Sequence, residues 1–331
     1  MKKSVNTQLE KGALVFLVDL VSLCFVPFIY RKGVISMEVT TKHEVSVDLR
    51  REGKLKEFWR RLKKNKSAMI GLILLALIVF FAAFANLICD EKLVRAQNAR
   101  MRLQSPSAEH WFGTDAYGRD IFTRVIFGSR ISLTIGLSAA AISLLLGGTF
   151  GAIAAYFGGM LDDVIMRIMD MLMAIPATLL ALCIVAALGG SMVNLLIALA
   201  LSNVPNFSRL ARAAIISVTG MEYVDAARAY GARHGRIIFK EILPNAIGPI
   251  IVQTTESVSV MILTASSLSF IGMGVQAPHP EWGAMLSEAR EFMRQYAYMS
   301  IFPGIFIIIT ALSFNLFGDG LRDALDPKLK D

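Results

Sequence analysis

Long apolar runs without charges alternate with short basic segments along most of this 331-residue chain. A helix that crosses a membrane needs about 20 mainly apolar residues, because the hydrocarbon layer is about 30 Å thick and each helical residue rises about 1.5 Å. The uncharged run 171–208 is too long for one crossing, and Gly189, Gly190 and Ser191 favour a turn in its middle. The pattern therefore predicts six spans, at residues 67–88, 131–157, 165–188, 192–208, 245–271 and 296–317.

The composition also indicates a membrane protein. Hydrophobic residues make up 55% of the chain and charged residues 18%. Soluble domains average about 45 to 50% apolar residues, glycine included, and about 25% charged residues. So much apolar sequence excludes a disordered chain, and three scattered cysteines exclude a disulfide scaffold. We expect an all-α, polytopic membrane protein whose transmembrane domain covers residues 67–331.

The net charge of +8 is explained by where the cations lie. Lys and Arg favour the cytoplasmic ends of membrane spans. Eighteen of them lie in the basic segment 50–66, the loop 209–244 and the tail, whereas nine lie on the opposite side of the predicted spans. This asymmetry places both ends of the six-span core and the loop 209–244 in the cytoplasm. It also accounts for the positive charge without a nucleic-acid partner.

Residues 1–49 form an N-terminal extension that allows two interpretations. The apolar stretch 13–30 carries Asp19 near its centre, where a carboxylate costs about 2.5 to 3.5 kcal/mol on insertion scales, so it is a marginal extra span. The preferred hypothesis is that residues 1–36 are not translated and that Met37 is the start. A mature chain that begins at Met1 would contradict this hypothesis.

Motifs of catalysis are absent from the sequence. It contains no phosphate-binding Gly-x-x-x-x-Gly-Lys-Ser/Thr loop, no His-Glu-x-x-His and no Gly-x-Ser-x-Gly. Its four histidines and three cysteines lack metal-ligand spacing. The prediction is a chain that is not an enzyme and does not hydrolyse ATP by itself, with no cofactor and no metal, so that any chemistry must be supplied elsewhere.

The loop 209–244 contains a segment suited to contact with another protein. Helical spacing puts Tyr223, Ala226, Ala227 and Tyr230 along one side, where the small alanines let a partner come close. Pro244 fits the first turn of the next helix, where its missing N–H costs nothing. The alternative is an amphipathic helix that lies on lipid headgroups.

Polar residues in the fifth predicted span are candidates for a substrate path. Gln253 and Glu256 lie at membrane depth, where an ionisable side chain usually faces a bundle interior or a water-filled cavity. For the serines and threonines nearby, hydrogen bonding within the helix bundle is the favoured interpretation. Asp163, Arg167 and Asp170 follow i, i+4 and i+7 spacing and are expected to neutralise one another.

The loop 209–244 also carries a family motif. Asp225-Ala226-Ala227-x-x-x-Gly231 is followed, after nine residues and then two more, by Leu243-Pro244. This pattern resembles the EAA loop by which permease subunits of bacterial ABC importers dock on their ATPases. Asp225 stands where the motif usually has Glu, and Glu241 stands where it often has Ile. The resemblance implies an ATPase-coupling role for Glu222, Tyr223, Asp225, Ala226, Ala227, Tyr230, Gly231, Leu243 and Pro244.

Three further blocks, 110–120, 272–283 and 315–327, look like segments of the C-type permease of dipeptide, oligopeptide and nickel importers. They occur in the family's order, so the resemblance runs from about residue 54 to the C-terminus. Within it, the outer segment 113–130 is expected to pack across the ends of the spans rather than to contact another protein.

The resemblance implies the six-helix core of an ABC importer permease, in a bacterial inner or plasma membrane. Its implied partners are a second homologous permease, two ATP-binding subunits, an extracytoplasmic solute-binding protein and the lipid bilayer. The implied substrates are dipeptides, oligopeptides or a related small solute such as a nickel chelate. An ion-coupled secondary transporter is the alternative, although no internal repeat of the kind common in such proteins is evident.

Overall fold

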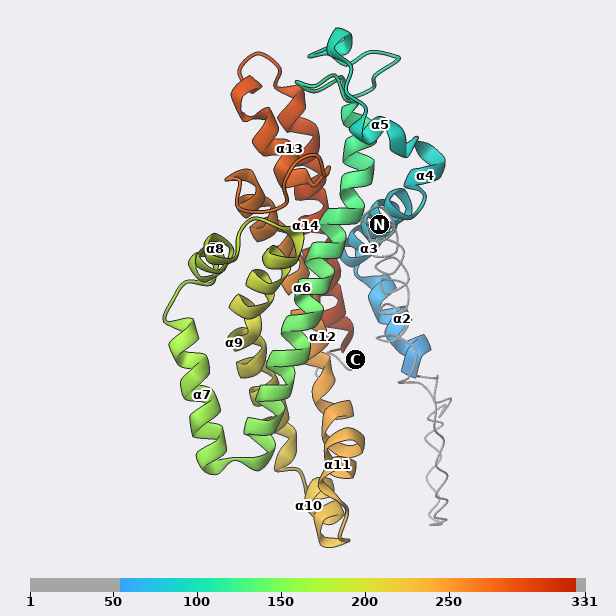
Figure 1. Cartoon of the computed structure of the whole chain (residues 1–331). Coiled ribbons are helices and arrows are strands. Elements are labelled where there is room, and N and C mark those ends of the chain that lie inside the picture. Colours follow the sequence, from blue (N-terminus) through green and yellow to red (C-terminus); the bar gives the residue numbers. More distant parts are fainter. Residues whose placement is uncertain (1–53, 326–331) are drawn as a thin grey trace, which may run out of the picture.

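The computed structural model describes residues 54–325, which form an elongated bundle of helices (Figure 1). The predictions for residues 1–49 and for the tail beyond residue 325 lie outside the described residues. The all-α prediction is confirmed. The elements are α2 Lys54–Lys64, α3 Lys66–Ala83, α4 Ala85–Ile88, α5 Glu91–Arg95, η1 Ala99–Met101, α6 Ile121–Phe157, α7 Gly159–Met173, α8 Ala177–Leu188, α9 Met192–Thr219, α10 Glu222–Ala229, α11 His234–Arg236, η2 Ile237–Ile242, α12 Leu243–Phe270, α13 Trp282–Ala289, η3 Arg290–Phe292 and α14 Tyr298–Leu325.

Four helical stretches of the described chain are long and apolar enough to cross a membrane. They are α3, α6, the continuous stretch His234–Phe270 and α14, and the bent pair α7 and α8 makes a fifth if it counts as one span. Between 28% and 44% of the most apolar part of each of the four is buried, so the remainder is available to lipid or to another chain. Helix α9 covers the predicted fourth span but is less apolar than these stretches. Its crossing of the membrane therefore stays a prediction.

The region of the third predicted span differs from a single straight helix. Helix α7 ends at Met173, helix α8 begins at Ala177, and the two are bent by 81°. Pro176 lies at the break. Proline lacks an N–H and disfavours helical geometry in the residue before it, so Ile175-Pro176 is the sequence signal for this break.

Helix α6 begins well before the predicted span at 131. Its N-cap is Asp120, whose Oδ2 accepts a hydrogen bond from the Thr123 N–H at 2.7 Å. An Asp in this position satisfies one of the free N–H groups of the first turn and favours helix initiation there. The resulting helix of 37 residues runs through the length of the bundle in Figure 1.

Helices α6 and α9 pack backbone against backbone. A Cβ atom at Gly147 would lie 2.5 Å from the Val204 carbonyl oxygen, and one at Gly151 would lie 2.2 Å from the Ser208 carbonyl oxygen. Only glycine permits such an approach, as in the small-residue contacts common between membrane helices. The Ser143 hydroxyl donates across the same seam to the Ala200 carbonyl at 2.9 Å.

The two ends of the bundle carry different structures. Figure 1 shows α10 and α11 at one end, and α13 with the loops around residues 96–120 at the other. At that other end, here called the outer end, Arg119 and Arg124 share the carboxylates of Asp115 and Glu288, with all four N–O distances at 2.6 Å. The cluster fastens the segment before α6 onto α13. The expectation that segment 113–130 packs across the spans agrees with these contacts.

Two acidic residues of α7, Asp162 and Asp170, pair with arginines of α9. Arg212 donates two hydrogen bonds to Asp162, both at 2.6 Å, and Arg209 pairs with Asp170. Asp170 was expected to be neutralised by Arg167 on its own helix. Its partner comes instead from α9, because α7 runs alongside α9 (Figure 1).

Candidate functional site

The candidate site is α10 with its two connections, at the end of the bundle opposite α13 (Figure 1). Helix α9 ends at Thr219, Gly220 and Met221 form the turn, and α10 follows over Glu222–Ala229. Eight residues are too few for a stable isolated helix, which is marginal below about 12 to 15 residues. Its conformation must therefore depend on its ends and on packing.

Gly231 ends α10. Its φ is +72°, a left-handed conformation that glycine adopts without strain. The Gly231 N–H donates to the Arg228 carbonyl at 2.9 Å and the Ala232 N–H to the Ala227 carbonyl at 3.1 Å. These two bonds form a Schellman motif, which satisfies the last carbonyls of a helix. A Cβ atom at Gly231 would meet nothing within 4 Å, so its requirement is conformational rather than steric.

Val224 anchors α10 to the bundle. Its side chain is fully buried in an apolar cluster that includes Ile215 and Val218 of α9 and Ile242 and Ala246 on the other side of the loop. Ala227 packs against the same cluster. Helix α10 thus packs on η2 and shares this apolar cluster with the end of α9 and the start of α12.

The outward surface of α10 is formed by two tyrosines and an alanine. Tyr230 is 91% exposed and Tyr223 is 39% exposed, and Ala226 between them is also exposed. The sequence predicted that Ala227 shares this surface. The structure turns it towards the bundle, because Val224 and Ala227, three residues apart, together form the packing face.

The charged side chains of α10 are placed so that they complement the helix dipole. Glu222 and Asp225 lie in its first turn and Arg228 in its last turn. Acidic groups near the N-terminus and basic groups near the C-terminus complement the helix dipole. Arg228 also donates to Asp225 at 3.1 Å, with both side chains exposed. The charges therefore stabilise the short helix and leave its outward surface exposed.

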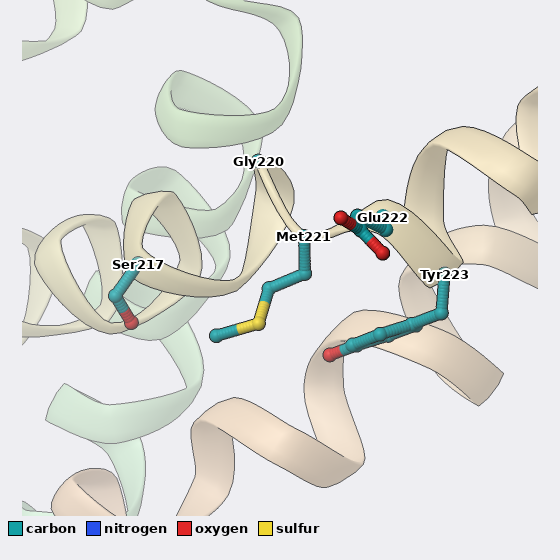
Figure 2. Close-up of a pocket in the computed structure, with 5 residues that line it drawn as sticks. All are labelled: Ser217, Gly220, Met221, Glu222 and Tyr223. Carbon is teal, nitrogen blue, oxygen red and sulfur yellow. The ribbon is translucent and has the colours of Figure 1, made fainter.

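An open hollow of about 550 Å³ lies where α9 passes into α10. It is lined by Ser217, Gly220, Met221, Glu222 and Tyr223. Figure 2 shows the Met221 and Tyr223 side chains extending to the same side, with Ser217 opposite on α9. An unbranched Met beside an aromatic ring gives an adaptable apolar surface. Such a surface suits contact with a protein rather than chemistry on a small molecule.

The chain returns to the membrane through a widened helical turn. Residues Ile237–Ile242 are π-helical and lead directly into α12, whose first positions are Leu243 and Pro244. Pro244 was expected in the first turn of a new helix. It does lie in the first turn of α12, and the π-helical residues lead into this turn without a break, so its missing N–H removes no hydrogen bond that the helix needs. Leu243 and Pro244 are both half-buried and lie apart from the exposed surface of α10.

A second connection holds this return segment. The Tyr156 hydroxyl, near the end of α6, lies 2.7 Å from Nδ1 of His234, and the two rings meet edge to face. Three long helices, α6, α9 and α12, therefore converge on the loop that carries α10.

The two path candidates lie in α12, away from α10. Gln253 and Glu256 are half-buried, and the Glu256 Cγ lies 3.4 Å from where a Cβ would stand at Gly318 of α14. Nearby hydroxyls serve the helix itself: Thr254 donates to the Ile250 carbonyl at 2.7 Å and Thr255 to the Ile251 carbonyl at 3.0 Å. Glu256 thus lies on the seam between α12 and α14.

The described residues contain no cluster of three or more His, Cys, Asp or Glu side chains that could hold a metal ion. Sequence reasoning singled out neither Val224 nor Met221. Val224 alone could have been found, as the apolar position that falls on the opposite face of the helix from Tyr230.

The sequence matches two family models. Residues 147–331 match the binding-protein-dependent transport system inner membrane component, and residues 54–106 match the N-terminal TM domain of oligopeptide transport permease C. The chain is 50% identical over 275 residues to the dipeptide transport system permease protein DppC of Alkalihalophilus pseudofirmus, which covers 83% of this chain and 90% of that relative.

Other relatives and one solved structure are also similar. Identity is 44% to the di/tripeptide transport system permease protein DppC of Pseudomonas aeruginosa, over 84% of this chain and 93% of that one. It is 41% to the glutathione transport system permease protein GsiD of Pectobacterium atrosepticum, over 83% and 91%. A chain of the inward-facing MetNI methionine ABC transporter covers 62% of this chain and 98% of its own length, with a TM-score of 0.52 and 16% identity, a likeness of fold.

Proposed function

We infer that this chain, which belongs to the family of binding-protein-dependent transport system inner membrane components, forms half of the path by which an ATP-driven importer carries short peptides. Membership of this family of ABC importer permeases excludes the ion-coupled secondary transporter. The chain is a membrane permease of a transport system. Its substrate, its partners and the orientation of its ends belong to the proposal.

Short peptides are the substrate class that the relatives favour. Three relatives to which this chain is similar are named for dipeptides, for di- and tripeptides and for glutathione, itself a tripeptide. A nickel chelate has no counterpart among these three names. Uptake of labelled dipeptide, glutathione and nickel chelate by cells that carry the complete transport system would separate the three substrates.

The partners follow from the family and from the surface of α10. We propose a second homologous permease, two ATP-binding subunits that hydrolyse ATP, and an extracytoplasmic solute-binding protein that delivers the peptide. Helix α10 would seat in a cleft of one ATP-binding subunit, on the cytoplasmic side. Its exposed Tyr223 and Tyr230 belong to a residue type that is enriched among the anchors of protein interfaces.

The anchoring of Val224 carries the coupling proposal. Because this side chain is buried in one apolar cluster with residues of α9, η2 and α12, we propose that a push on α10 moves these helices rather than the loop alone. A rigid element seated in a partner is what transmission of a conformational change requires. Gln253 and Glu256 are proposed to line the path that this movement opens.

Gly231→Trp tests the coupling. The complex should still assemble in the membrane, but the indole at the exposed end of α10 should obstruct its seat. Peptide uptake into proteoliposomes is expected to fall about tenfold or more, equivalent to about 1.4 kcal/mol, while ATP hydrolysis persists. The ratio of peptide transported to ATP hydrolysed is the decisive measurement.

Two control variants separate the effect of the bulky indole ring from the effect of backbone strain at position 231. Gly231→Ala imposes the same left-handed strain without the ring, and should retain most uptake. Gly235→Trp places the same ring four residues away, where a Cβ atom also meets nothing within 4 Å. Normal coupled uptake by Gly231→Trp would contradict the docking role of α10.

A further inference from the structure

Helix α2 has two unlike faces. On one face Phe58 and Leu62 pack against Ala68 of α3 and against Phe317 and Ala324 of α14, with Leu62 only 1% exposed. The opposite face is basic. This contrast makes α2 a strongly amphipathic helix that is fixed to the bundle by its apolar side.

The position of α2 places it at the edge of the hydrocarbon layer. Asn65 alone separates it from α3, one of the helices that can cross a membrane. The Asn65 Oδ1 caps α3 by accepting from the Ala68 N–H at 3.1 Å, and its Nδ2 donates to Asp323 of α14 at 2.8 Å. The 18 residues of α3 span about 27 Å at about 1.5 Å each, close to the thickness of the hydrocarbon layer. The basic helix therefore starts where the lipid headgroups start.

The basic face presents a row of cations to the surroundings. Lys56, Arg60 and Lys63 are exposed and follow i, i+4 and i+7 spacing, so they share one side of the helix. The single acidic residue of α2, Glu57, pairs with Arg61 at 2.6 Å. Six cations and this one carboxylate leave α2 strongly basic.

Trp59 borders the basic row. It is 43% exposed, and the Lys63 ammonium lies 5.5 Å from the centroid of its ring. Trp is enriched where hydrocarbon meets headgroups, because its ring is apolar and its N–H is polar. An exposed Trp next to exposed cations fits a lipid surface better than the water-facing side of a soluble domain.

We propose that the basic face of α2 binds the headgroups of anionic phospholipids in the leaflet that it borders. Each cation near an anionic membrane surface contributes about fivefold in affinity, equivalent to about 1 kcal/mol. Three cations on one face, held by a helix that is itself packed on α3 and α14, form a preformed site for phosphate groups. The site is separate from α10 and from the peptide path.

The test compares lipids retained by the purified complex. The full chain is purified with its partner subunits in mixed micelles of a detergent and phosphatidylcholine with a tenth of phosphatidylglycerol, and retained lipids are counted by mass spectrometry. The variant Lys56→Gln, Arg60→Gln, Lys63→Gln is expected to lose at least about tenfold of the preference for phosphatidylglycerol. The charge-conserving variant Lys56→Arg, Lys63→Arg should keep it.

A matched control uses three exposed cations elsewhere. Lys92→Gln, Arg95→Gln, Arg100→Gln removes the same charge from the segment before α6 and should leave the preference unchanged. Equal loss in this control would show a general charge effect and overturn the proposal. So would unchanged retention in the α2 variant, loss of a partner subunit instead of lipid, or displacement of the lipid by millimolar inorganic phosphate.

Discussion

Glu281 is a buried carboxylate at the outer end of the bundle. It is fully buried and caps α13, accepting the Gly283 N–H at 2.9 Å and the Ala284 N–H at 2.8 Å. The hydroxyls of Ser132 and Ser266 lie 3.4 and 3.5 Å from its Oε1. Burial raises the pKa of the Glu281 carboxyl above its ordinary value, and the N–H donors only partly offset this.

The raised pKa of Glu281 predicts a pH-dependent stability. The Glu281 carboxyl binds its proton more tightly in the folded state than in the unfolded state. Its contribution to the free energy of unfolding is therefore complete below an ordinary carboxyl pKa of about 4.3 and is lost as pH rises through the folded pKa. The apparent Tm of the wild type, relative to Glu281→Gln, should fall as pH rises from about 4.5 and then level off. Thermal unfolding of both proteins in detergent gives this difference, and a constant difference up to pH 8 would contradict the account.

Glu256 allows a prediction about the charge of the substrate. If this half-buried carboxylate meets the amino terminus of a peptide, Glu256→Gln removes a charge-assisted contact of about 1.5 to 3 kcal/mol, or about tenfold or more in uptake. An N-acetylated peptide should be carried equally by both proteins. Competition between free and acetylated dipeptides in proteoliposomes measures this, and equal loss for both would assign Glu256 to packing on Gly318.

At the scale of elements, the sequence predicted best where one physical rule dominates. The long, mainly apolar runs within α3, α12 and α14 had to be helices, because backbone groups in lipid must be bonded within the segment. The bend between α7 and α8 was missed, although Pro176 marked it, since apolar length alone cannot show a break. The orientation of Ala227 was missed because spacing defines two faces without saying which one is buried.

Helix α13 is fastened to the start of α6 by the charge cluster at the outer end. Arg124, with a side chain only 1% exposed, contacts both Asp115 and Glu288 at 2.6 Å. Arg124→Met leaves the two carboxylates to Arg119 alone, and breaking a buried pair costs about 3 to 5 kcal/mol. We therefore expect a large fall in the apparent Tm, measured by size-exclusion after heating.

An exposed ion pair serves as the control for Arg124. Arg209 and Asp170 have side chains that are 50% and 56% exposed, and such pairs contribute about 0 to 1 kcal/mol. Arg209→Met should therefore hardly change the apparent Tm. Equal shifts in the two variants would mean that the buried cluster has no special part in holding α13.

At the scale of the whole molecule, the orientation is the prediction with the widest consequences. Ala226 in α10 and Ala108 in the loop before α6 are both exposed, and α10 and this loop lie at opposite ends of the bundle (Figure 1). In a protein whose three native cysteines are replaced, Ala226→Cys should react with an impermeant maleimide only in inside-out vesicles. Ala108→Cys should react only in intact spheroplasts. The reverse pattern would place α10 outside and end the coupling proposal.

The sequence located the candidate site but did not show which side chains contact one another there. The motif from Asp225 to Pro244 identified the loop, and its composition identified a helix with an accessible side. The sequence could not show that Val224 joins two helices, that Tyr156 reaches His234, or that Pro244 follows a π-turn. Each of these depends on contacts between segments far apart along the chain, which no local pattern encodes.

The seam of Gly147 and Gly151 restricts how the molecule can alternate between its two openings. At this seam the backbones of α6 and α9 touch without intervening side chains, so the two helices resist sliding against each other. We therefore expect α6 and α9 to tilt together as one rigid unit. We expect bending at the joint near Pro176, where α7 and α8 stand at 81°. We expect a cross-link across this joint to arrest the transporter in one state, and a cross-link between α6 and α9 to leave its cycle intact.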